Sequence, residues 1–321
     1  MAAGKPQAEC KLVIKVLLWR ISEHARFALI AGLIAGLALP GLAARLQPWL
    51  PQMVAGLLVI TALRVGHRAA GGALSDLTWG IGSVAVLQLG LPLSLFGLFQ
   101  LLGLGGTPVA LAVILATAAP ALSGSPNLAL ILGQDAGRMM QILVLGTACF
   151  PLTVLPLFAL LPELGSPAEV FSAAVRLLAV ITGATALGFA LRAVLFPAPQ
   201  PETIKALDGL SVLAFSGIVI GLMAALTPAL QDDPRDVLRW MIIAFALSYG
   251  VQVVTMVFLR RSRLAPVAGP LAIGAGNRNI ALFLVALPEQ VVAPIMVFIG
   301  CWQVPMYLTP ILLRRLYQRR A

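Results

Sequence analysis

Hydrophobic residues form long stretches along most of the chain, and charged residues mark where each stretch ends. A membrane-spanning helix needs about 20 apolar residues. The run at residues 77–134 therefore holds two spans, divided by the Gly- and Pro-rich turn at 103–108. The pattern predicts ten spanning helices, the sixth extending back toward Val170, on these runs: 27–44, 46–63, 77–134, 139–162, 177–191, 209–231, 240–259, 264–288 (uncharged apart from Arg278) and 290–313.

Two of the predicted spans contain helix-breaking residues followed by an asparagine. Residues 118–135 read AAPALSGSPNLALILGQD, and residues 270–287 read PLAIGAGNRNIALFLVAL. When Asn127 is aligned with Asn279, the next five residues are similar, and the two segments lie about half of the 321-residue chain apart. Interrupted hydrophobic segments at corresponding places in two halves indicate the binding site of a transporter.

Composition places the protein in a membrane. Hydrophobic residues make up 60% of the chain and charged residues 11%, with a mean hydropathy of +0.98. These values exclude an ordinary soluble domain, and long runs without alternation favour helices over a β-barrel. The three cysteines are scattered, so the sequence predicts neither disulfides nor a thiolate metal site.

The basic residues predict the orientation of the chain. If the N-terminus is cytoplasmic, most of the 22 Lys and Arg residues fall in the N-terminal segment, the inner loops and the C-terminal tail. This distribution follows the positive-inside rule. We therefore expect a multi-pass protein of the cell (inner) membrane with both termini in the cytoplasm. The net charge of +10 is then explained by basic residues in the cytoplasmic loops of a protein that spans the lipid bilayer, and it does not indicate a nucleic-acid partner.

The orientation also gives the two interrupted spans, helices four and nine, opposite directions across the membrane. This predicts an inverted duplication of five helices plus five. The expected organisation is a cytoplasmic or interfacial segment at 1–24, a first repeat at 25–163, a second, inverted repeat at 169–313 and a basic cytoplasmic tail at 314–321.

The breaks supply the candidate binding residues. Pro126 removes an amide donor in helix four, while Ser123 and Ser125 offer hydroxyls beside Asn127. In helix nine, glycines precede three polar residues, Asn277, Arg278 and Asn279. If the breaks cross, the half-helix ends offer partial charges to a ligand. The alternative is an ordinary proline kink in one helix and a glycine packing seam in the other.

Arg278 is the one clearly intramembrane charge that the sequence predicts. Such a charge costs at least ~2.5 kcal/mol, so it should be functional and paired. No carboxylate lies within the predicted spans, which leaves backbone carbonyls, amides such as Asn127, or an anionic ligand as partners. One interpretation is therefore a ligand-binding cation. The other is a structural pin that joins the two broken helices through backbone carbonyls.

At these residues the sequence resembles the bile acid:sodium symporter family, as a divergent bacterial-type homologue. The motif of the family in helix four, which ends in Ser/Thr-x-Ser-Asn, corresponds to residues 120–127, and Glu-x-Gly-x-Gln-Asn corresponds to 274–279. A Gln-then-Pro pattern in helix three falls on Gln88 and Pro92. The resemblance implies an all-α fold of ten helices in two inverted repeats, with helices four and nine crossing in a core domain beside a panel domain.

The departures from this family concern the ion site. The sodium-binding glutamate corresponds to Gly274, its neighbouring glutamine to Arg278, and the serine before the asparagine of helix four to Pro126. The hydroxyls of helix five expected near Met139 and Leu143 are absent. A hard cation needs oxygen ligands, usually with a carboxylate. We infer that the Arg278 guanidinium takes the place of sodium, so no cofactor is expected.

The sequence thus predicts a secondary active transporter of a small organic anion that works by alternating access. The expected substrate or ion-binding residues are Gln88, Ser123, Ser125, Pro126, Asn127, Asn277, Arg278 and Asn279. The alternatives are a sodium-coupled symporter of an organic solute with a rearranged ion site, a channel, or a non-transporting membrane sensor. No catalytic motif occurs in the spans, so an enzyme is not expected. The sequence leaves the oligomeric state open.

Overall fold

The computed structural model of the protein describes residues 5–72, 76–161 and 164–318. Regular structure within these ranges is helical, apart from one isolated bridge between Ala121 and Arg278. The side chains of residues 5–13, 26, 68 and 69 lie outside this description. The described residues also exclude three parts of the predicted organisation: the first four residues of the N-terminal segment, the end of the first repeat at 162–163, and the last three residues of the basic tail.

Seven helical segments of the described chain are long and apolar enough to cross a membrane, or eight if a bent pair at 14–38 counts as one span. This supports an all-α, multi-pass membrane protein. The expected total of ten, and the inverted repeat, remain predictions. The two interrupted spans are not among these segments, because their helices Pro108–Ala118 and Ala265–Gly276 are too short to cross a membrane alone. The expected early start of the sixth span is confirmed, since α10 runs from Pro167 to Leu195.

One predicted boundary is wrong. The first span does not continue from residue 27 to 44, because α2 (Ala25–Ala38) ends before Pro40, which opens α3 (Pro40–Leu46). Proline has no backbone N–H to donate and suits the first turn of a new helix. The residues from 40 onward join the next candidate span, Pro40–His67.

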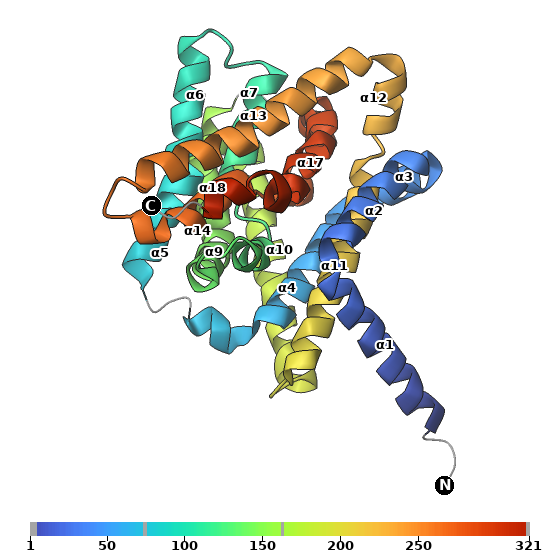
Figure 1. The fold of residues 1–321 in the computed structure, drawn as a ribbon. Coiled ribbons are helices and arrows are strands. Elements are labelled where there is room, and N and C mark those ends of the chain that lie inside the picture. Colours follow the sequence, from blue (N-terminus) through green and yellow to red (C-terminus); the bar gives the residue numbers. More distant parts are fainter. Residues whose placement is uncertain (1–4, 73–75, 162–163, 319–321) are drawn as a thin grey trace. The chain divides into compact units, whose positions relative to one another are not determined.

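The chain divides into two compact units, each drawing on both predicted repeats. Unit 1 is Met1–His67 with Gly183–Ala224. In it, α11 (Pro201–Leu222) packs along α1 (Lys5–Glu23), α2 and α3, as Figure 1 shows. A 3-10 turn (Gln47–Trp49) leads from α3 into α4 (Leu50–Gly72). An ion pair of 2.9 Å between Arg64 of α4 and Asp208 of α11 adds a polar contact in this unit.

Unit 2, Arg68–Thr182 with Ala225–Ala321, contains both interrupted segments. Its α14 packs against α13 and α9, and α13 also packs against α17. Buried apolar residues of α8, α9 and α14 form one core cluster. Its elements are α5 (Leu77–Ala85), a π-helical turn η2 (Val86–Gly90), α6 (Leu91–Leu101), α7 (Pro108–Ala118), α8 (Ser125–Ile131), α9 (Ala136–Leu160), the first part of α10, α12 (Leu226–Asp232), α13 (Pro234–Leu259), η4 (Ala265–Val267), α14 (Ala268–Gly276), η5 (Ile280–Leu282), α15 (Phe283–Ala286), α16 (Glu289–Val292), η6 (Ala293–Ile295), α17 (Met296–Leu312) and α18 (Arg314–Gln318).

Candidate functional site

The two interrupted segments meet at their breaks. After α7 the chain leaves the helical conformation at Ala119, and after α14 it leaves at Asn277. The Leu122 N–H donates to the Asn277 carbonyl at 2.9 Å, and the Asn279 N–H donates to the Pro120 carbonyl at 2.8 Å. In an apolar environment, irregular backbone persists only where other protein groups or water satisfy it. Here each break supplies hydrogen-bond partners to the other.

Arg278 lies at the centre of this junction and is 0% exposed. Its guanidinium donates three hydrogen bonds to backbone carbonyls: Nε to Ala275 at 3.0 Å, Nη1 to Ala119 at 3.0 Å and Nη2 to Leu87 at 2.7 Å. The planar fork of a guanidinium suits such divergent acceptors. The three carbonyls belong to α14, the end of α7 and the π-helical turn, so one side chain joins three segments.

The π-helical turn η2, between α5 and α6, frees the Leu87 carbonyl. In the π-helical turn the Leu91 N–H donates to Val86, five residues back, and so misses Leu87. The next residue, Pro92, has no N–H to donate. The Leu87 carbonyl therefore has no donor within its own helix, and Arg278 supplies one. Single π-helical turns of this kind are frequent at functional sites.

The other two carbonyls are free because helices end beside them. Ala119 follows the last residue of α7, and Pro120 prevents the helix from continuing. Ala275 lies in the last turn of α14, and the Asn279 N–H that would reach it in a longer helix pairs with Pro120 instead. The carboxyl end of a helix carries a partial negative charge. Two such ends therefore face the Arg278 guanidinium.

These contacts correspond to the structural-pin interpretation of Arg278. Among the described residues the hydrogen bonds of its guanidinium go to carbonyls, and the ion pairs of Arg64, Arg138 and Arg239 do not involve it. Asn127, the amide that the sequence offered as a partner, is exposed on α8 and is not among the hydrogen-bond partners of Arg278. Because the guanidinium is fully buried, a ligand cannot dock directly on it in this conformation.

Buried polar side chains of α13 and α17 donate hydrogen bonds to the break that follows α14. The Trp302 Nε1 donates to the Arg278 carbonyl at 3.1 Å, and the Thr309 hydroxyl donates to Asn277 Oδ1 at 3.2 Å, both from α17. The Ser248 hydroxyl of α13 donates to the Gly276 carbonyl at 2.9 Å. Sequence reasoning missed Trp302 and Thr309 as partners of the break, since neither belongs to the interrupted segments.

The same network continues to the C-terminal helix. The Gln252 Nε2 donates to the Ser248 carbonyl at 3.1 Å, and Gln252 Oε1 accepts from the Tyr317 hydroxyl at 2.8 Å. Both side chains are buried, at 0% and 4% exposure. Hydrogen bonds thus run from α18 through α13 to the end of α14. The predicted basic tail therefore begins as a packed helix.

The remaining predicted site residues divide into buried and accessible ones. Gln88 is buried, and its Oε1 accepts from the Thr153 hydroxyl at 2.9 Å. Ser125 is 0% exposed, and its Oγ has no hydrogen-bond partner among the described residues. Asn127, on α8, is exposed. Of the rest, Pro126, Asn277 and Asn279 are buried, and Ser123 is half-buried.

The residues at the sodium position implied by the family resemblance do not fit that ion. Gly274 has no side-chain oxygen, and a Cβ placed there would lie 3.4–3.5 Å from the apolar side chains of Ile142, Leu87 and Met139. The nearby carbonyls of Ala119, Ala275 and Leu87 already accept from Arg278. Sodium requires several oxygen donors around one point. The described residues at this position offer apolar packing and a fixed cation.

Comparison with the models of known protein families and with curated proteins gives no match. The resemblance described above therefore rests on the motifs at the two breaks and on the predicted layout of the helices.

Proposed function

We propose that the protein is a secondary transporter of a small organic anion that works by alternating access, without a coupling sodium ion and without catalytic activity. One observation carries the proposal. Two broken helices, about half the chain apart, meet at their breaks around a fully buried arginine. Discontinuous helices that meet in this way are how many transporters build a substrate site.

The cost of this arrangement supports a functional origin. A continuous apolar helix would satisfy its own backbone and would need no buried charge. This chain instead breaks two helices and holds a guanidinium within its apolar unit. Intramembrane ionisable groups are rare and usually mark ion or substrate pathways.

Arg278 in this proposal replaces the coupling ion as a permanent cation. It remains protonated under all physiological conditions, so it does not relay protons. It neutralises the partial negative charges of two half-helix ends, the task that a bound cation would perform in a sodium-dependent carrier. The substrate then moves without co-transport of an ion at this position.

The proposed substrate contacts are the accessible polar groups after the break between α7 and α8, namely Asn127 and the half-buried Ser123 four residues before it. The Oγ of Ser125, two residues from each, has no hydrogen-bond partner among the described residues but is fully buried, so it would meet the substrate only in a conformation that exposes it. Arg278 keeps this segment in place through Ala119 and contributes positive potential. A direct contact between the substrate and Arg278 would require a conformation in which the guanidinium is exposed.

The test is uptake by proteoliposomes in buffers of sodium or choline, with labelled acetate, pyruvate and benzoate as probes. We expect saturable, counterflow-stimulated uptake of at least one probe at equal rates in both buffers. Asn127→Ala should abolish uptake and leave the melting temperature unchanged, while the exposed amide substitution Gln231→Ala is the control. Full uptake by both Asn127→Ala and Arg278→Ala would refute the proposal. Uptake without saturation or counterflow would indicate a channel.

A further inference from the structure

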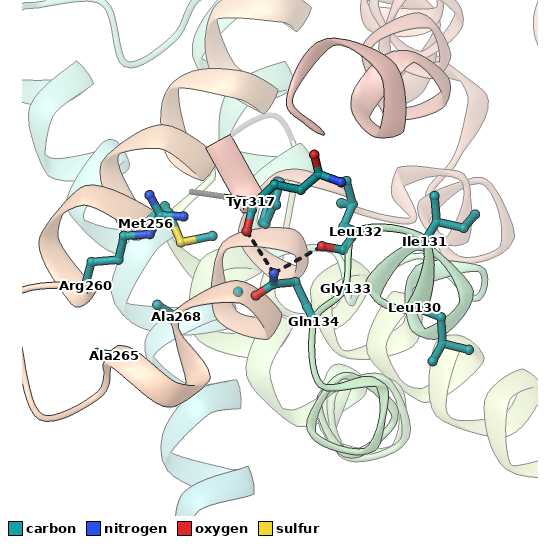
Figure 2. A pocket seen from close by; sticks show the side chains of 12 residues that line it. Leu130, Ile131, Leu132, Gly133, Gln134, Met256, Arg260, Ala265, Ala268 and Tyr317 are labelled. Carbon is teal, nitrogen blue, oxygen red and sulfur yellow. Dashed lines mark hydrogen bonds between the residues drawn. The ribbon is translucent and has the colours of Figure 1, made fainter. Parts of the chain in front are cut away.

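A cavity of about 440 Å³ lies within unit 2. It is lined by the end of α8, the end of α13, the start of α14 and the C-terminal helix α18. Figure 2 shows Arg260 and Met256 on one side of it, with Gln134 and Tyr317 at the centre. Its volume lies in the range of about 300–1,000 Å³ that small-molecule sites occupy.

The charge of the cavity comes from Arg260, the residue after the end of α13. Its guanidinium donates to the Leu316 carbonyl of α18, which fixes the side chain at the wall. No carboxylate occurs among the described residues that line the cavity. The nearest acidic residue in sequence to that lining, Asp135, accepts from the Arg138 N–H at 2.9 Å as the cap of α9. An anionic group in the cavity would therefore meet a cation without a competing acid.

The wall opposite Arg260 is held in place by backbone and amide contacts. Gly133, with φ of 69°, ends α8 in a left-handed conformation, and the Gln134 N–H turns back to the Ala129 carbonyl at 2.8 Å. The Gln134 Nε2 then donates to the carbonyls of Leu132 at 3.2 Å and Tyr317 at 3.1 Å. The two hydrogen bonds of the Gln134 side chain, drawn in Figure 2, fix this wall of the cavity within the fold.

The apolar residues at the cavity indicate what kind of anion it takes. Leu130 and Ile131 line it and are 65% and 63% exposed. In a chain that spans a bilayer, such residues border lipid acyl chains. Arg260 supplies the positive charge of the cavity lining, and basic pockets at the cytoplasmic side of membrane proteins bind anionic lipid head groups. The distribution of basic residues among the loops predicts that the loop after α13 lies on the cytoplasmic side of the membrane.

We propose that this cavity binds a phosphate group, supplied by the head group of an anionic phospholipid whose acyl chains lie along Leu130 and Ile131. The phosphate pairs with Arg260, and α18 covers the site through Gln134 and Tyr317. The proposal is independent of transport. A dissolved phosphate ion has the same charged chemistry without the acyl chains, so the experiment must separate the two sources.

The experiment measures melting temperature of the full-length protein in detergent with added phosphatidylglycerol, phosphatidylcholine or inorganic phosphate. A ligand that binds only the folded state raises the melting temperature, by about 5 °C when its concentration is about 100 times Kd. We expect phosphatidylglycerol, and not phosphatidylcholine, to give this rise in the wild type. The variant Arg260→Gln should lose it. The neighbouring variant Arg261→Gln, with the same loss of charge, should keep it.

A second pair of variants tests the site without changing Arg260. Ala265→Glu places a carboxylate in the cavity and should also abolish the rise, while Ala265→Gln should retain most of it. If inorganic phosphate alone gives the rise with the same pattern of variants, the phosphate site stands and its ligand is a dissolved ion. Equal rises in Arg260→Gln and Arg261→Gln, equal rises with both lipids, or no rise with any probe would overturn the proposal.

Discussion

Replacing Arg278 by methionine removes a buried cation and its three hydrogen bonds while keeping a long side chain in the space. The carbonyls of Leu87, Ala119 and Ala275 then lose their donor in a region that is closed to solvent. Each unsatisfied buried acceptor costs roughly 1–3 kcal/mol, which makes a total of about 3–9 kcal/mol. Against this, the variant avoids the cost of a buried charge, at least ~2.5 kcal/mol. The expected net loss of stability is about 3 kcal/mol.

The assay is thermal unfolding in detergent, followed by the fluorescence of the five tryptophans. A loss of about 3 kcal/mol lowers the melting temperature by roughly 6 °C or more. Arg278→Lys should fall between the wild type and the methionine variant, because one ammonium cannot reach three divergent carbonyls at once. The exposed substitution Arg176→Met is the matched control and should change the melting temperature little.

A chemical rescue makes the test more specific. Arg278→Ala leaves space for a small planar cation between the same three carbonyls. Low millimolar methylguanidinium should therefore raise the melting temperature of this variant and leave the wild type unchanged. An Arg278→Met protein that melts within about 1 °C of the wild type would refute the reasoning, since the three hydrogen bonds would then contribute nothing net.

Three further predictions concern the surroundings of the site. Gly276→Ala should destabilise the protein by about 1–3 kcal/mol, because the new Cβ would lie 2.3 Å from the Ser248 carbonyl oxygen. Gly250→Ala is the control, since a Cβ there would have no atom within 4 Å, and equal melting temperatures for the two variants would contradict the prediction. Tyr317→Phe removes the hydroxyl that donates to Gln252 and should cost about 1–2 kcal/mol, seen as a lower melting temperature, with the exposed Ser262→Ala as control. The hydrogen bond from Arg138 holds the pKa of Asp76 below its usual 3.8, so the stabilising contribution of this carboxylate is present above about pH 4 and is lost as the pH falls through the lowered value. The difference in melting temperature between wild type and Asp76→Asn should therefore shrink from pH 7 to pH 3, and a constant difference would contradict this.

Much of the architecture follows from the sequence because membrane helices are long, apolar and bounded by charges. The positions of both breaks are visible as prolines, glycines and serines within apolar runs. Their meeting follows from the requirement that broken backbone be satisfied within protein. The misplaced end of the first span at Pro40 shows the limit of counting uncharged residues, since proline starts a new helix there without any charge.

The partners of Arg278 could be predicted only by class. The sequence leaves carbonyls, amides and a ligand as candidates, and in the structure the guanidinium donates to the carbonyls of Leu87, Ala119 and Ala275. The Leu87 carbonyl is available only because of a π-helical turn, which hydropathy does not reveal. Pro92 is the one local signal, because it removes the N–H that the turn would otherwise use.

Which of the predicted site residues are accessible could not be predicted from the sequence either. Asn127 and Asn279 occupy matching positions in the two segments, yet Asn127 is exposed and Asn279 is 4% exposed. Repeat alignment treats such residues as equivalent, whereas burial depends on which neighbours pack against each segment. The network through Ser248, Gln252 and Tyr317 likewise depends on tertiary contacts between helices far apart in the chain.

The most direct test of the central claim is the melting temperature of the wild-type protein in sodium chloride and in choline chloride at equal ionic strength. A bound ion raises the stability of the folded state. If the Arg278 guanidinium stands in the place of a coupling cation, the two melting temperatures should be the same. A higher melting temperature in sodium would contradict the claim and would indicate a sodium-coupled symporter with a rearranged ion site.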